Sequence, residues 1–275
     1  MTPELNAGTL LNELFIDTVG ISVPLFRPEL CFVATIVLLL LCRMLPLLRY
    51  VDSGGIALGG VCFAAWFAYV DFIGIESQVG ESLLSTSAVR QELFGGLLVF
   101  DSFTAFLRLV LAGFLILYIA MTKLSGIPDR EDGADFYSLV LGSSLGMCLM
   151  VSANNLLMVF MAVEMASVPS YVLAGMLKGR PASSEAALKY AVYGAGTAGV
   201  MLYGISLISG VLGTLVLPDI SYEMSRVLAA GGTSGSTMVL CLGGLMLSVG
   251  LAFKLSAVPF HFWCPDVFEG AAAEV

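Results

Sequence analysis

Residues 250–263 read Gly250-Leu-Ala-Phe-Lys254-Leu-Ser-Ala-Val-Pro259-Phe-His261-Phe-Trp263, which places a lysine in an apolar segment and a proline five residues later. A charge at the centre of a membrane helix costs roughly 2.5–3.5 kcal/mol on insertion scales, so it is seldom present without a function. Pro259 has no backbone N–H, and its ring clashes with the carbonyl four residues earlier, that of Leu255. Broken helices are tolerated in membranes where they face protein or a water-filled cavity. A charge beside a helix break therefore predicts an ion path.

The composition of the 275-residue chain is that of a polytopic membrane protein. Only 12% of the residues are charged and the mean hydropathy is +0.95, whereas soluble domains are about 25% charged. About seven apolar segments reach the roughly 20 residues that a membrane span needs; we place them at 29–49, 55–75, 96–122, 136–153, 155–176, 186–211 and 237–257. We expect an all-α transmembrane bundle over 29–275. Residues 1–28 are mixed in polarity and are expected at the membrane surface.

Two classes of function are disfavoured by the composition. The formal net charge is −9 and no basic patch occurs, which argues against nucleic-acid binding. The cysteines are scattered through apolar runs without a C-x-x-C pair, which supports neither a metal site nor a disulfide framework. They are Cys31, Cys42, Cys62, Cys148, Cys241 and Cys264.

A second charge within an apolar segment repeats the spacing of the first. Glu164 is followed by Pro169 five residues later, as Lys254 is followed by Pro259. An acid and an amine on neighbouring helices can pair and neutralise each other in a low dielectric. A buried lysine gives up its proton readily, and His261, the only histidine, could relay one. Alternatively, Glu164 and Lys254 form a structural ion pair, and His261 is a packed interfacial residue.

Three further ionisable residues lie in or near the expected spans. Lys189, near the start of the sixth span, could extend to the membrane interface. Glu185, one helical turn earlier, would then be its surface partner. Asp101 and Arg108 are seven residues apart in the third span and so share a helix face. We expect them to be structural or contact residues.

Four blocks of sequence carry a resemblance to a known family. The chain resembles the antiporter-like membrane subunit N, called subunit 2 in mitochondria, of respiratory complex I (NADH:quinone oxidoreductase). The resemblance covers nearly the whole chain from about residue 29. The blocks are 96–103, 136–156, 164–190 and 250–271.

The resemblance implies roles for individual residues. Glu164 matches the fifth-helix acid of the family, and Lys254 matches the lysine on its broken seventh helix. Their pairing would gate a proton half-channel. Lys189 matches an additional membrane lysine, and His261 lies in the segment that leads to the eighth helix. All four are therefore candidates for proton translocation.

The resemblance also implies that this chain is an N-terminal half. The family fold has about fourteen helices in two inverted repeats, each with one broken helix. The sequence ends after the seventh, so the eighth-helix ionisable residue and the twelfth-helix lysine would belong to a C-terminal half. It also departs from the family at 269–275, where Glu269-Gly-Ala-Ala-Ala-Glu-Val replaces a proline-rich loop.

The function implied is that of a proton-translocating membrane-arm subunit, which couples quinone reduction to proton pumping as part of an enzyme complex. The chain itself would hold no cofactor; NADH, FMN, iron–sulfur clusters and quinone would bind to partner subunits. Its partners would be the other membrane-arm subunits, the C-terminal half and the lipid of a bacterial plasma membrane or mitochondrial inner membrane. One alternative is a subunit of a multisubunit cation/proton antiporter or membrane-bound hydrogenase. Another is a non-pumping structural or assembly subunit.

Overall fold

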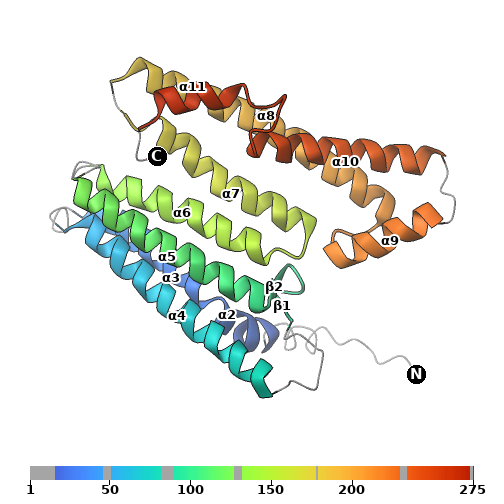
Figure 1. The fold of residues 1–275 in the computed structure, drawn as a ribbon, viewed down its shortest axis with the longest axis horizontal. Helices are drawn as coiled ribbons and strands as arrows, with labels where there is room; N and C mark the ends of the chain where they lie inside the picture. Colours follow the sequence, from blue (N-terminus) through green and yellow to red (C-terminus); the bar gives the residue numbers. More distant parts are fainter. Residues whose placement is uncertain are drawn as a thin grey trace. The chain divides into compact units, whose positions relative to one another are not determined.

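The computed structural model describes residues 16–45, 51–81, 90–126, 132–177, 179–229, 234–272 and 275. It divides into two compact units, residues 1–153 and 154–275. Both are built from helices (Figure 1). The expectation of an all-α polytopic membrane protein is confirmed. Lys178, Glu274 and the first fifteen residues of the expected surface segment lie outside the described residues.

The first unit is a bundle of four long helices. A π-helical turn η1 (Ile16–Ser22) and a short α2 (Val23–Leu25) lead into the bundle, and residues 17–25 meet the following helix at a bend of 78°. Helix α3 packs against α4 and α6, and α4 packs against α5. The long helices are α3 (Arg27–Met44), α4 (Ser53–Glu81), α5 (Ser102–Ser125) and α6 (Gly133–Ser152).

A small β-hairpin precedes α5, where the sequence alone predicted a helix from residue 96. Strands β1 (Gln91–Leu93) and β2 (Leu98–Phe100) pair antiparallel. Helix α5 cannot begin earlier because Asp101 is its N-cap, and the carboxylate accepts the backbone N–H of Thr104 at 2.8 Å. Asp101 therefore lies outside the span, and the expectation that it shares a helix face with Arg108 is wrong.

The second unit is organised around one long helix. Helices α7, α10 and α11 all pack on α8, and buried apolar side chains of α8 such as Met201 and Ile205 form its core with Leu156 and Leu240. The helices are α7 (Leu156–Ala174), α8 (Pro181–Leu212), α9 (Leu217–Ala229), α10 (Ser234–Lys254) and α11 (Trp263–Gly270).

Glycines let α8 and α10 approach very closely. A Cβ atom on Gly204 of α8 would lie only 2.7 Å from the carbonyl oxygen of Gly243 in α10. Seven residues further along α10, a Cβ atom on Gly250 would lie 2.6 Å from the Cβ of Met201. The two helices therefore touch at two points where no larger residue fits.

Six described helices are long and apolar enough to cross a membrane, and the bent pair formed by residues 17–25 and 27–44 would make a seventh. The chain is an integral, multi-pass membrane protein. Helix α7 runs through Pro169 without a break. The amphipathic helix α9 has no counterpart among the expected elements. Its sequence combines apolar residues with the charged residues Asp219, Glu223 and Arg226.

Candidate functional site

The helix that carries Lys254 ends at that lysine. The end is a Schellman motif, in which the Ala257 N–H donates to the Ala252 carbonyl at 2.8 Å and the Ser256 N–H donates to the Phe253 carbonyl at 3.0 Å. Ser256 takes the left-handed conformation that the motif requires, with φ of 51°. The break predicted between Lys254 and Pro259 is therefore present. Lys254 is the last residue of α10, rather than lying within a span that continues to residue 257.

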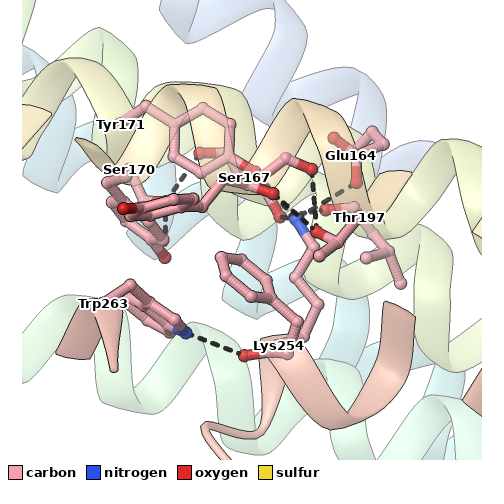
Figure 2. A network of polar contacts seen from close by, with 12 residues as sticks. Glu164, Ser167, Ser170, Tyr171, Thr197, Lys254 and Trp263 are labelled. Carbon is pink, nitrogen blue, oxygen red and sulfur yellow. Dashed lines mark hydrogen bonds and ion pairs between the residues drawn. The ribbon is translucent and has the colours of Figure 1, made fainter. Parts of the chain in front are cut away.

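The side chain of Lys254 reaches three oxygen atoms on α7 (Figure 2). Its ammonium donates hydrogen bonds to the Ser167 hydroxyl at 2.6 Å and to the Tyr171 hydroxyl at 2.9 Å. Glu164 Oε1 lies 3.1 Å from the same nitrogen. The three acceptors lie at positions i, i+3 and i+7 of α7 and so share one helix face. The structure thus brings together Glu164 and Lys254, as the sequence predicted.

Glu164 holds Lys254 by charge rather than by an aligned hydrogen bond. Its Oε1 atom is shielded from solvent and has no hydrogen-bond partner among the described residues, although the ion-pair distance is short. Both side chains are largely buried, at 20% exposure for Glu164 and 16% for Lys254. An ion pair in such surroundings is screened far less than one at the surface. The state of the pair is therefore sensitive to any change of charge nearby.

The hydroxyl partners are fixed by their surroundings in α7 and α8. The Ser167 hydroxyl donates its own proton to the Val163 carbonyl at 2.7 Å, so its lone pair faces Lys254. The Tyr171 hydroxyl has room because α8 carries Gly194 opposite it; a Cβ atom there would collide with the phenol oxygen. Sequence reasoning did not select Ser167 or Tyr171, although their spacing from Glu164 places them on the same face.

Lys189 and His261 lie apart from this cluster. The Lys189 ammonium forms ion pairs with Glu185 at 2.8 Å and with Asp266 of α11 at 2.7 Å, and its side chain is 36% exposed. Its contacts are thus those of the surface pair that the sequence offered as an alternative. His261 is exposed in the turn between α10 and α11, and its imidazole has no hydrogen-bond partner among the described residues.

A second pair of buried charges belongs to the first unit. Arg108 of α5 pairs with Glu29 of α3, and these side chains are 2% and 0% exposed. Arg108 also donates to the Leu25 carbonyl at 3.1 Å and lies over the ring of Phe100. The expectation that Arg108 is a contact residue fits this arrangement. Glu29 was not singled out, because an acid in the first turn of a helix usually complements the helix dipole at the surface.

Comparisons with known proteins give a family model and several relatives that the chain resembles. Residues 153–275 match the family model described as the transmembrane region of NADH:quinone oxidoreductase and Mrp antiporters. NADH-quinone oxidoreductase subunit N 2 of Sorangium cellulosum is 34% identical over 259 residues, which cover 92% of this chain and 49% of the relative. The subunit N 2 of Symbiobacterium thermophilum is 42% identical over 188 residues, covering 67% of this chain and 37% of the relative.

A solved structure supports the same relationship. A chain of respiratory complex I from Thermus thermophilus, solved with bound aureothin, matches with a TM-score of 0.65 and 27% identity, covering 90% of this chain and 48% of the other. The chain spans about half the length of the relatives it matches or less. Residues 153–275 thus match this family model, and the chain is similar over most of its length to NADH-quinone oxidoreductase subunit N.

Proposed function

We propose that this chain forms part of a proton-translocating membrane subunit of an NADH:quinone oxidoreductase, with Lys254 as the group that takes up and releases the proton. The observation that carries the proposal is the position of the Lys254 ammonium at the end of a broken helix, where oxygen atoms of Glu164, Ser167 and Tyr171 surround it. Two of the three N–H donors of the ammonium bind the Ser167 and Tyr171 hydroxyls, and the Glu164 carboxylate supplies an opposite charge 3.1 Å away. These three oxygen atoms stabilise the charged form of the lysine.

The same site can also hold the neutral amine that remains after Lys254 has lost a proton. The Tyr171 hydroxyl can donate to a neutral amine as well as accept from an ammonium. Glu164, in contrast, interacts strongly only with the charged form. A change in the charge or position of Glu164 would therefore alter the proton affinity of Lys254, while the hydroxyls keep the nitrogen in place.

The interaction energy of the Glu164–Lys254 pair is comparable to the energy needed to move a charge across the membrane. Unit charges 4 Å apart interact by about 4 kcal/mol at an effective dielectric constant of 20. Moving one charge against a membrane potential of 100 mV costs about 2.3 kcal/mol. Breaking the Glu164–Lys254 pair is therefore a large enough change to drive a proton from Lys254 against the membrane potential.

The remaining parts of the process would lie outside this chain. NADH, FMN, iron–sulfur clusters and quinone would be held by partner subunits, and their redox energy would arrive through neighbouring membrane-arm subunits. The remaining helices of the antiporter fold would carry the proton onward. Within this chain, His261, exposed beyond the helix break, would exchange protons with water. Lys189 would bind protons at the α8–α11 surface beside Glu185 and Asp266.

The test is the variant Lys254→Met in the intact complex, reconstituted into vesicles. We expect NADH:quinone reduction to continue while the number of protons moved per electron falls. Lys123→Met is the matched control, because Lys123 pairs with Asp52 at the exposed end of α5. A normal proton-to-electron ratio in Lys254→Met would refute the proposal. Movement of sodium in place of protons would favour the cation/proton antiporter alternative.

A further inference from the structure

We propose that Trp263 is a positioning residue for Lys254, and that helix α11 sets the place of the ammonium through this indole. The proposal rests on the function proposed above for Lys254. Trp263 is the first residue of α11 and is 7% exposed. Two separate chains of contacts lead from its side chain to the two ends of Lys254.

The first chain reaches the backbone of Lys254. The indole Nε1 donates a hydrogen bond to the Phe253 carbonyl at 3.2 Å, and this bond is buried. The same carbonyl accepts the Ser256 N–H of the Schellman motif, so both of its lone pairs are used. Phe253 immediately precedes Lys254 and is fully buried. The indole therefore fixes the last turn of α10 from which the lysine side chain starts.

The second chain reaches the ammonium end. The Trp263 ring stacks on Tyr190 of α8, with ring centroids 4.5 Å apart and an angle of 6° between the planes. Tyr190 in turn meets Tyr171 of α7 edge to face, also at 4.5 Å, and the Tyr171 hydroxyl holds Lys254 Nζ. Figure 2 shows Trp263 and Tyr171 on the same side of Lys254. One indole thus constrains both where Lys254 begins and where its charge lies.

Helix α11 is itself held firmly on α8. A Cβ atom on Gly270 would lie 2.5 Å from both the Ala182 carbonyl oxygen and the Ala186 Cβ, so the two backbones are in direct contact. One helical turn before Gly270, Asp266 of α11 forms an ion pair with Lys189 of α8. A displacement of α11 along α8 would carry the indole with it. The indole would then move the Phe253 carbonyl and the aromatic stack together.

The test compares Trp263→Phe with Trp66→Phe in the intact complex. Trp263→Phe keeps a ring in the stack and removes the N–H donor. Trp66 is the only other tryptophan of the chain; it is 61% exposed on α4 and serves as the matched control. We expect assembly and quinone reduction to persist in both variants. The proton-to-electron ratio should fall only in Trp263→Phe.

Hydrogen–deuterium exchange gives a readout that does not depend on pumping. Loss of the indole bond should speed exchange of the Ser256 and Ala257 amides by on the order of fivefold, the effect of one typical hydrogen bond. Unchanged exchange at these amides in Trp263→Phe would overturn the positioning role, whatever Lys254→Met does. Failure of the proposed function is seen separately, as normal pumping in Lys254→Met.

A double-mutant cycle separates positioning of Lys254 from a general loss of packing. Tyr171→Phe removes the hydroxyl that holds the ammonium. If Trp263 acts through Lys254, its substitution and Tyr171→Phe affect the same group, and their effects on the proton-to-electron ratio are coupled. Independent effects that simply combine would contradict the proposal.

Discussion

The guanidinium Nε of Arg108 in α5 lies 2.6 Å from Glu29 Oε1 in α3, with both side chains withdrawn from solvent. Removing one partner of a buried ion pair leaves an unpaired charge and typically destabilises a protein by about 3–5 kcal/mol, whereas replacing both by apolar groups can be nearly neutral. We expect Arg108→Met alone to lower the thermal midpoint strongly. Arg108→Met combined with Glu29→Leu should recover most of the loss. A double variant that loses the sum of the losses of Arg108→Met and Glu29→Leu would show that the pair is not coupled.

The space opposite Tyr171 provides a second test of the site. We expect Gly194→Ala to push the Tyr171 hydroxyl away from Lys254, because the added Cβ would collide with it. The proton-to-electron ratio should fall while quinone reduction continues. Gly196→Ala, two residues along the same helix, meets nothing within 4 Å and is the control. The expectation fails if the two variants pump alike.

The contact between α8 and α10 is sensitive to a single methyl group. In Gly204→Ala the new Cβ would approach the backbone of Gly243 and Leu247 within 2.8 Å, and backbone atoms cannot rotate away. Overpacking of this kind typically costs about 1–3 kcal/mol. Gly199→Ala, on an open face of α8, should be neutral or stabilising, because alanine favours the helix by up to about 1 kcal/mol. Thermal midpoints of the purified variants measure the difference.

The end of α10 stores strain at Ser256. A non-glycine residue at φ of 51° is unfavourable by roughly 1–2 kcal/mol, whereas glycine adopts that conformation freely. Glycine also loses more conformational entropy on folding, so the net gain from Ser256→Gly should be below about 1 kcal/mol. We expect a small rise in thermal midpoint with pumping unchanged. A fall in the midpoint would mean that the serine side chain contributes more than its backbone strain costs.

A pH-dependent contribution to stability comes from Asp52, just before α4. The Lys123 ammonium, which donates a hydrogen bond to Asp52, holds the pKa of that carboxyl below its usual value of 3.8. The charged carboxylate therefore stabilises the fold above the unfolded pKa, and the effect is lost as the pH falls through the folded pKa. The pair is exposed, so its contribution is small, about 0.2–1 kcal/mol. The midpoint difference between wild type and Asp52→Asn should be present at pH 7 and should shrink as the pH falls below 3.8 and through the lower folded pKa of Asp52.

The sequence predicted the charged centre of the site well because each charge stood out against apolar neighbours. Lys254 and Glu164 could not be assigned to loops, and each was followed by a proline. The two prolines nevertheless act differently. Pro169 stays within α7, whereas α10 ends before Pro259. The Schellman hydrogen bonds donated by Ser256 and Ala257 end α10 before Pro259, and sequence periodicity does not reveal them.

Strand β2, the start of α5 and the two hydroxyl partners of Lys254 were not predicted, because their few polar residues lie within long apolar segments. Leu98–Phe100 is as apolar as the helix that follows, so the sequence pattern predicts a first helical turn where the structure has a strand. The sequence Asp101-Ser-Phe-Thr104 is a helix-cap pattern that would have corrected the boundary. Ser167 and Tyr171 were passed over because neutral hydroxyls are common in membrane helices. Their spacing from Glu164 was the available signal.

The paired glycine contacts of α8 and α10 determine which movements are open to the lysine. One close contact would be a pivot, but contacts at both Gly243 and Gly250 are two points on a line, about 10 Å apart along the helix. Helix α10 therefore cannot tilt about one contact on α8 without opening the other. Movement of Lys254 would therefore arise in its own four-carbon side chain, in the last turn of α10 and in the eight residues, 255–262, that follow the helix end.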